Sequence, residues 1–198
     1  MKCSILKSEP LIKLSLQSFN FYVAVNSYEW MKTRSGRVDE LNLDTNRIVR
    51  AFQQATEQMC RLNKNAAKLL HKYNAHASTD VTGFGIIGHA DNLAKAQQEN
   101  VRFVIDKLPI IEYMDEISKK MANGNGFNLF TGTSAETSGG LLIALSAEDA
   151  EKYVVEIEEL DGFPAWIIGH VEASKASKEA IISSDYTVES VPSRIHGN

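Results

Sequence analysis

The spacing of apolar residues predicts a long amphipathic helix in the first half of the chain. The residues that form this apolar stripe are Ile48, Phe52, Ala55, Met59, Leu62, Ala66 and Leu69. They recur at intervals of four and three positions, which places them on one face of a helix. Asp44, Thr45 or Asn46 can cap its N-terminus through a side-chain oxygen. We interpret the stripe as a core-facing surface, because about three heptads are too short to favour a coiled coil.

Helical and extended patterns alternate through the rest of the chain. A short strand leading into a helix is expected at residues 23–30, and a further helix is expected after Ser146, which can form a capping box with Asp149. Other helices are predicted at residues 85–98 and from Pro109 to about residue 121. Strands are predicted at residues 75–82, 101–105, 139–145, 165–169 and 186–191. This alternation is typical of a layered α/β or α+β domain.

The two ends of the chain show no clear pattern. In residues 1–22, Leu, Ser, Lys and Phe mix without a clean period, so we place no element there and expect an irregular or poorly ordered segment. We expect the folded domain to occupy residues 23–191 and a short tail to occupy residues 192–198.

Composition and charge exclude several classes of protein. The 198 residues are 43% hydrophobic and 23% charged, which is ordinary for a soluble globular chain. A formal net charge of −4 gives no basic excess, so we expect no nucleic-acid partner. No run approaches the roughly 20 apolar residues that span a membrane. The two cysteines, Cys3 and Cys60, form no disulfide framework or zinc spacing, and with no signal-peptide pattern at the start they favour a reducing, cytoplasmic setting.

Candidate chemistry concentrates in residues 79–89, which read TDVTGFGIIGH. Here a carboxylate precedes a glycine-rich turn and then a helix, a pattern that suits a phosphate group and its metal ion. Asp80 is the candidate Mg²⁺ ligand, while Thr82, Gly83 and Gly85 are candidates for shaping the phosphate end of the site. We interpret His89 as a packing or capping histidine rather than a catalytic one.

A dinucleotide-binding module is the alternative for the same segment. Gly83, Gly85 and Gly88 match the three-glycine fingerprint, and Asp106 falls at the end of the next predicted strand, where a ribose-binding acid would sit. The residues just before the glycines are polar, however, whereas the first strand of a dinucleotide fold is buried on both faces and rich in Val and Ile. We therefore favour the metal–phosphate interpretation.

Several segments taken together resemble one known family. The segment TDVTGFGIIGH is followed by Leu108-Pro109-Ile110-Ile111, then by AETSGGLLIAL and finally by AWIIGHV. In this order and at these separations they are similar to the C-terminal domain of eukaryotic-type selenophosphate synthetases, over about residues 23–171. Segment 136–142 alone would be a weak signal, because a turn entering a buried strand often has this composition.

The resemblance implies a fold and an activity. Members of this family form selenophosphate, AMP and phosphate from selenide, ATP and water, and they belong with the aminoimidazole ribonucleotide synthetases. The implied fold is a three-layer α/β/α domain of the α+β class, with a mixed sheet flanked by helices. The implied cofactors are Mg²⁺ and ATP. Asp80 matches the C-terminal aspartate that helps the family hold Mg²⁺ on the ATP phosphates.

This sequence also departs from the family pattern. The family's first domain supplies a reactive cysteine or selenocysteine, an adjacent lysine and further aspartates, and this chain has no matching segment. Cys3 lacks the flanking glycine of that motif, so we do not assign it as the nucleophile. We expect little activity from the chain alone. The alternative function is a non-catalytic form that pairs as a homodimer, or as a heterodimer with the full-length enzyme, and modulates it.

Overall fold

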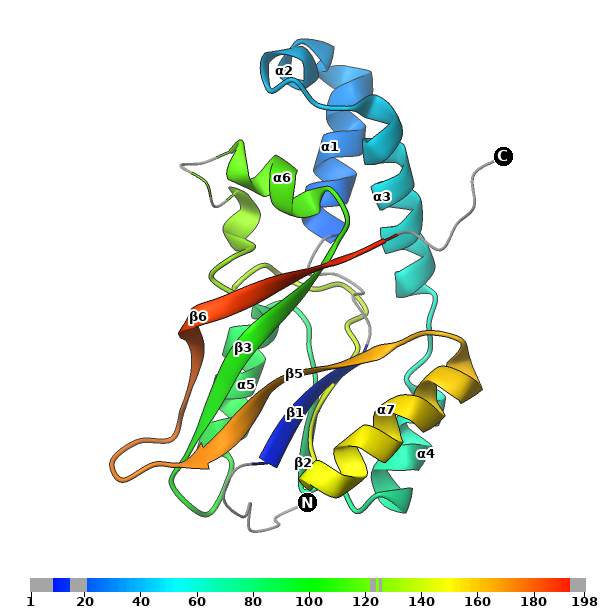
Figure 1. Ribbon diagram of the computed structural model, residues 1–198. Coiled ribbons are helices and arrows are strands. Elements are labelled where there is room, and N and C mark those ends of the chain that lie inside the picture. The colour runs from blue at the N-terminus through cyan, green and yellow to red at the C-terminus, as the bar shows by residue number, and fades with distance from the viewer. Residues whose placement is uncertain (1–8, 15–20, 122–123, 125, 193–198) are drawn as a thin grey trace.

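A six-stranded sheet forms the centre of the protein, with strand order β2-β4-β1-β5-β3-β6 (Figure 1). The computed structural model describes residues 9–14, 21–121, 124 and 126–192. The strands are β1 (Glu9–Leu14), β2 (Ala77–Asp80), β3 (Val101–Ile111), β4 (Leu141–Ala144), β5 (Ala165–Ala173) and β6 (Glu179–Val191). Strands β3 and β6 run parallel and the other neighbours run antiparallel, which confirms the mixed sheet.

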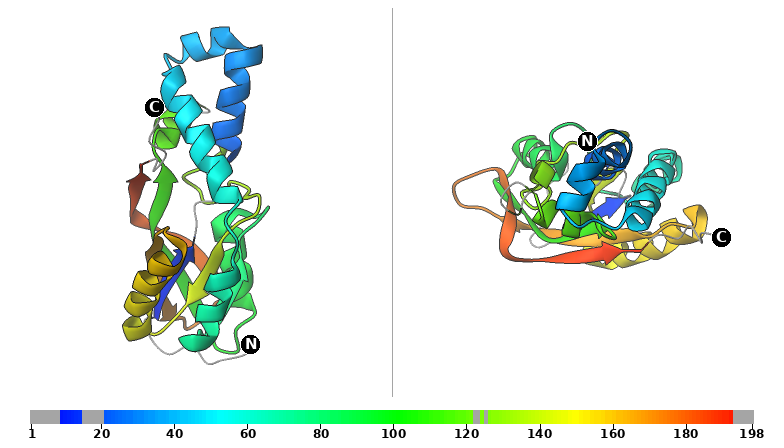
Figure 2. Two further views of the ribbon diagram at one scale, coloured as in Figure 1. Left: turned by 90° about the vertical axis from the view of Figure 1, so that its right-hand side faces the viewer. Right: turned by 90° about the horizontal axis from the view of Figure 1, so that it is seen from above.

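Helices cover both faces of this sheet (Figure 2). They are α1 (Phe21–Thr33), α2 (Ser35–Glu40), α3 (Thr45–Met59), α4 (Lys64–Lys72), α5 (Gly85–Lys95), α6 (Met114–Lys119) and α7 (Ala147–Asp161). Alternate side chains of β4 enter two separate cores, because successive residues of a strand point to opposite faces. Leu142 belongs to a core that includes residues of α1, α3 and α5, whereas Ile143 belongs to a core that includes residues of α4 and α7. The predicted three-layer α/β/α fold is therefore confirmed.

The first strand corrects our expectation for residues 1–22. We placed no element there, yet β1 lies in the middle of the sheet, between β4 and β5. Its sequence, EPLIKL, has too little alternation to indicate a strand by itself. Pairing with two neighbours forms the strand instead, because both edges of β1 find backbone partners in the sheet. The predicted tail beyond residue 192 lies outside the described residues.

The predicted long helix is divided into α3 and α4. Asp44 caps α3 as expected, since its carboxylate accepts hydrogen bonds from the N–H groups of Asn46 and Arg47. Residues 60–63 then interrupt the stripe, and Leu62 is 74% exposed instead of buried. Tertiary contacts hold this interruption: the Asn63 amide donates to the carbonyl of Gly139. The heptad pattern could not show that contact.

Two other element predictions were wrong. Residues 23–30 are helical from the start of α1 and contain no strand. Pro109 does not begin a helix but lies within β3, and α6 begins at Met114. A proline fits there because β5 pairs only with residues 101–105 of β3, so near Pro109 the strand has a neighbour on one side alone among the described residues.

Helices α4 and α7 are joined by a small polar cluster. Glu156 accepts hydrogen bonds from the Lys72 ammonium, at 2.7 Å, and from the Tyr73 hydroxyl, at 2.5 Å. The Lys72 hydrogen bond, followed by the Tyr73 hydrogen bond, holds the pKa of the Glu156 carboxyl below its ordinary value. The cluster therefore stabilises the folded state only while Glu156 is ionised.

No helix among the described residues is long and apolar enough to cross a membrane.

The Glu156 cluster gives a pH-dependent prediction. Because the folded-state pKa of Glu156 is lowered, its contribution to stability is present above its unfolded value of about 4.5 and is lost as the pH falls through the folded value. We expect Glu156→Gln to lower the free energy of unfolding at pH 7 and to lower it by a smaller amount at pH 3. Urea denaturation at both pH values measures the difference. An equal loss of unfolding free energy at both pH values would contradict a stabilising role of the ionised Glu156 carboxylate.

Gly169 gives a second prediction. A Cβ at this position of β5 would lie 1.9 Å from the carbonyl oxygen of Val104, beside an irregularity in the β1–β5 register. We expect Gly169→Ala to destabilise the fold by about 2 kcal/mol or more, since two strands must move apart. Gly36→Ala is the matched control, because a Cβ there meets nothing within 4 Å. Chemical denaturation should show no loss for the control.

Candidate active site

Asp80 lies at the surface, at the end of the edge strand β2. Among the strands that the structure describes, β2 pairs only with β4, and the order of the sheet places it at one edge. Asp80 is the last residue of this strand and is exposed, while Val81 directly after it is fully buried. The buried valine anchors the chain at the point where the carboxylate faces solvent. Asp80 is thus the exposed acid at the entry to the glycine turn.

Main-chain hydrogen bonds join the glycine turn to segment 132–140. The N–H of Val81 donates to the carbonyl of Gly140 at 3.1 Å, and the N–H of Glu136 donates to the carbonyl of Thr82 at 2.8 Å. Further along, the N–H of Ile87 donates to the carbonyl of Gly132 at 3.1 Å. The two segments that carry the family resemblance therefore form one structural unit.

Two glycines are required by this close contact. Gly85 has a φ of +68°, and a Cβ on it would lie 2.4 Å from the carbonyl oxygen of Gly132. A Cβ on Gly139 would lie 1.4 Å from the carbonyl oxygen of Val81. By contrast, a Cβ on Gly83 would meet nothing within 4 Å. Packing thus explains Gly85 and Gly139, and Gly83 is the open point of the turn.

The start of α5 has fewer free backbone N–H donors than an ordinary helix N-terminus. Four N–H groups lack an intrahelical partner at the start of any helix. Here the N–H of Gly85 donates to the Thr82 carbonyl, and that of Ile87 donates to Gly132. Two early donors are therefore already bonded within the protein. The exposed side of Gly83 and Phe84 is the part of the turn that remains accessible to a ligand.

His89 and Thr82 connect the helix to the turn. The N–H of Thr82 donates to His89 Nε2 at 2.9 Å, and the Thr82 hydroxyl oxygen lies 3.1 Å from the same nitrogen. The imidazole ring also packs against the Phe84 ring, with the centroids 5.6 Å apart. These contacts agree with the interpretation of His89 as a packing and capping residue.

Glu136 is a residue whose position the sequence did not reveal. Its side chain is only 4% exposed, and its main chain contacts Thr82 directly. Burial of a carboxylate is costly, so it signals a specific environment beside the turn. The one sequence signal was an acidic residue among small polar residues just before a buried strand.

Asp80 could serve as one ligand of a hydrated metal ion, but it does not form a complete metal site with its described neighbours. In the part of the chain that the structure describes, no three His, Cys, Asp or Glu side chains are grouped closely enough to hold a metal. Mg²⁺ keeps several waters and uses one or two carboxylates together with phosphate oxygens. A single exposed carboxylate beside an open turn can supply one such ligand.

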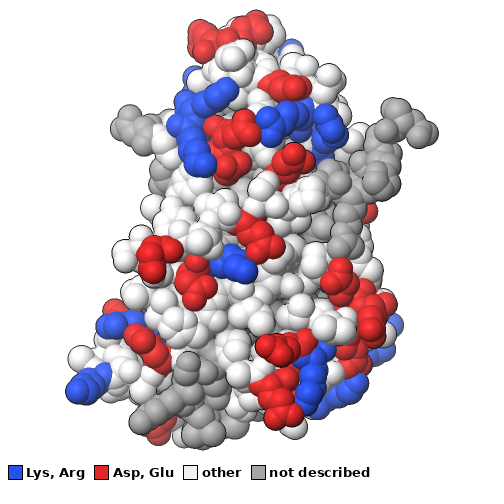
Figure 3. All heavy atoms as spheres, in the orientation of Figure 1, with Lys and Arg blue, Asp and Glu red and all other residues white. Residues whose placement is uncertain are grey.

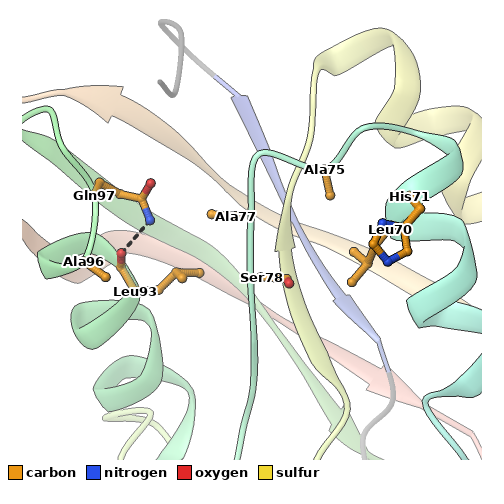
Figure 4. A pocket seen from close by; sticks show the side chains of 8 residues that line it. All are labelled: Leu70, His71, Ala75, Ala77, Ser78, Leu93, Ala96 and Gln97. Carbon is orange, nitrogen blue, oxygen red and sulfur yellow. Dashed lines mark hydrogen bonds between the residues drawn. The ribbon is translucent and has the colours of Figure 1, made fainter. Parts of the chain in front are cut away.

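A hollow of about 550 Å³ lies along the outer edge of β2, between α4 and α5 (Figure 4). It is lined by Leu70, His71, Ala75, Ala77, Ser78, Leu93, Ala96 and Gln97. This lining holds no carboxylate, lysine or arginine, and it includes no residue of the glycine turn. The hollow therefore lacks the groups that a metal–phosphate site needs.

The fold differs from the one that a dinucleotide fingerprint requires. In that fold the strand before the glycines is buried and runs parallel to its neighbours. Here β2 is an edge strand, antiparallel to β4. The candidate ribose-binding acid, Asp106, lies inside β3, 3.4 Å from His170. Of the three glycines, Gly85 serves the contact with segment 132–140 instead, whereas Gly83 is open and Gly88 faces the Phe84 side chain.

Charged side chains are mixed on the face shown in Figure 3, where basic and acidic groups are interspersed. Several charged side chains of the protein form ion pairs, such as Arg47 with Glu116 and Arg102 with Glu179. The hydrogen bond that the Arg102 guanidinium donates to Glu179 raises the pKa of Arg102, because it favours the charged form. This face offers no continuous basic surface to a polyanion.

Comparisons with known proteins agree with the resemblance in the sequence. Residues 25–182 match the family described as AIR synthase related protein, C-terminal domain. A probable selenide, water dikinase of Caenorhabditis elegans is 61% identical over 176 residues, which is 87% of this chain and 47% of the relative. The chain spans about half the length of the curated relatives it matches.

Solved structures share the fold at low sequence identity. Escherichia coli HypE aligns with a TM-score of 0.61 and 16% identity over 98% of this chain and 52% of its own. The hydrogenase maturation protein HypE in complex with ATP aligns with a TM-score of 0.56 and 17% identity, over 90% of this chain and 48% of its own. These likenesses confirm the fold.

The contrast between the two glycines of the turn predicts different effects of the same substitution. We expect Gly85→Ala to lower the free energy of unfolding by about 2 kcal/mol or more, because of its positive φ and the collision with Gly132. It should also speed hydrogen exchange at the Ile87 amide. Gly83→Ala should change neither quantity appreciably. Equal effects at the two positions would contradict this assignment of their roles.

Proposed function

This chain belongs to the family of AIR synthase related proteins and carries their C-terminal domain, and from this we propose that it is the C-terminal half of a selenide, water dikinase. Such an enzyme converts selenide, ATP and water to selenophosphate, AMP and phosphate. The identity of 61% to a relative named as a probable selenide, water dikinase supports this specific activity. The observation that carries the proposal is the exposed Asp80 carboxylate beside the glycine turn.

In this proposal Asp80 holds Mg²⁺ on the phosphates of ATP. The bound ion would neutralise phosphate charge and orient the phosphate chain. Asp80 suits this role because its carboxylate is exposed at the end of a strand whose next residue, Val81, is fixed in the core. One carboxylate holds Mg²⁺ weakly, so the other half of the enzyme supplies further ligands.

Thr82, Gly83 and Gly85 present the turn to the phosphates. Gly85 fixes the turn against segment 132–140, and Thr82 is bonded through both its N–H and its carbonyl. Gly83 has open space around it, which lets phosphate oxygens approach the backbone closely. A turn that is rigid before the ligand arrives costs less free energy to order on binding.

The exposure of Phe84 supports an active site shared with a second unit. This side chain is 68% exposed directly beside Gly83, although a large aromatic ring favours burial. Another domain packed over the turn would cover the ring and exclude water from the phosphates. The chain alone therefore has little activity in this proposal. An association with the full-length enzyme would place the same surface against a partner.

The proposal predicts a specific loss on substitution of Asp80. In the full-length enzyme that contains this chain, Asp80→Asn should lower ATP turnover by at least about 100-fold and raise the Mg²⁺ concentration for half-maximal rate, because a charged ligand is lost. Initial rates of AMP formation across a Mg²⁺ titration measure both quantities.

Asp39→Asn is the matched control for that experiment, since Asp39 is exposed on α2 and lies far from the turn (Figure 1). It should retain wild-type turnover and Mg²⁺ dependence. Unchanged turnover in the Asp80 variant would remove Asp80 from the metal site. If the wild-type enzyme forms no AMP with selenide, the proposed selenide, water dikinase activity is wrong.

A further inference from the structure

Three hydrogen bonds hold the main chain of Thr82 in place. Its N–H donates to His89 Nε2 at 2.9 Å. Its carbonyl accepts from the N–H of Gly85 at 3.0 Å and from the N–H of Glu136 at 2.8 Å. Two of these partners are backbone groups, and His89 is the side chain among them. A side chain can be changed without altering the course of the backbone, so this bond can be tested by itself.

The direction of the hydrogen bond fixes the form of the imidazole. A ring nitrogen accepts a hydrogen bond only when it carries no proton. Since the backbone N–H of Thr82 can only donate, His89 Nε2 must be the unprotonated nitrogen. The ring is then neutral, with its hydrogen on Nδ1. The Thr82 hydroxyl lies 3.1 Å from the same nitrogen and reinforces this arrangement.

His89 contacts the residues on both sides of Gly83. It binds Thr82 through Nε2, and its ring packs against Phe84 with a centroid separation of 5.6 Å and an interplanar angle of 47°. Gly83 itself has no neighbour within 4 Å of a Cβ position. The side of Gly83 that a side chain would occupy is therefore open, and His89 touches both residues that flank it.

We propose that His89 is the positioning residue of the phosphate-facing turn: as a neutral imidazole protonated on Nδ1, it binds the Thr82 N–H and packs on Phe84, so that Gly83 is fixed in the shape that receives ATP. The part that concerns ATP rests on the proposed function. His89 touches no reacting group in this proposal and acts through the turn. It restrains a flexible glycine before the ligand binds, which avoids an ordering cost at the moment of binding.

The first experiment examines the hydrogen bond in this chain without any ligand. In ¹⁵N-labelled protein we expect a scalar coupling between the Thr82 amide nitrogen and His89 Nε2, and an Nε2 chemical shift typical of an unprotonated ring nitrogen. His89→Leu should speed hydrogen exchange of the Thr82 amide about tenfold, the effect of losing one hydrogen bond. A protonated Nε2, or unchanged exchange at Thr82, would overturn the proposal.

Conservative variants separate a positioning role from a general effect on folding. His89→Gln keeps an acceptor near the place of Nε2 and should restore protection of the Thr82 amide to within about threefold of wild type. His89→Asn has a shorter side chain and should fail to restore it. His71→Gln, an exposed histidine on α4, is the control and should leave the Thr82 amide unchanged. Equal protection in the Gln and Asn variants would contradict the proposed bond.

The second experiment measures ATP use by the full-length enzyme. His89→Leu should raise the KM for ATP about tenfold with a smaller change in kcat, and His89→Gln should reverse most of that rise. If the Thr82 amide loses protection while the KM stays unchanged, the positioning role is wrong even though the hydrogen bond exists. Failure of the proposed function is distinguishable, because the wild-type enzyme would then form no AMP with selenide.

Discussion

The main-chain contact between residues 81–87 and residues 132–140 determines the form of the candidate active site. Each of its hydrogen bonds joins backbone groups that are buried or partly buried, where an unpaired polar group would be costly. The contact is so close that Gly139 cannot carry a side chain beside the Val81 carbonyl. The contact fixes the start of α5 and the end of β2, where Asp80 is the last residue. A turn that would otherwise be flexible becomes a rigid part of the fold.

The sheet supports this contact from behind. Strand β4 pairs with β2 immediately after segment 132–140, and β1 lies on its other side. Because β2 is an edge strand, Asp80 reaches solvent while Val81 stays in the core. The same rigid element thus provides both an anchor and an exposed carboxylate. Sites built on the ends of strands hold their side chains more rigidly than sites on free loops.

The surface around the turn is consistent with one part of a shared site. Asp80 is a single carboxylate, Gly83 is open, and Phe84 is exposed beside them. Phosphoryl transfer depends on placing metal ions, phosphate and nucleophile together, because positioning supplies most of the rate. In the proposed function, the described residues provide a rigid phosphate-facing surface and one metal ligand. This division agrees with a chain that spans about half the length of its curated relatives.

Local sequence patterns predicted most of the elements, the layered fold and the segment that carries the candidate site. The periodic patterns located α5 and α7, and the cap residues Asp44 and Ser146 marked where α3 and α7 begin, because these signals depend on neighbouring residues alone. Only the tertiary structure showed β1 inside the sheet, the break between α3 and α4, and Pro109 within β3. It alone brought Glu136 to Thr82. These features depend on contacts between residues far apart in the chain, which no local pattern records.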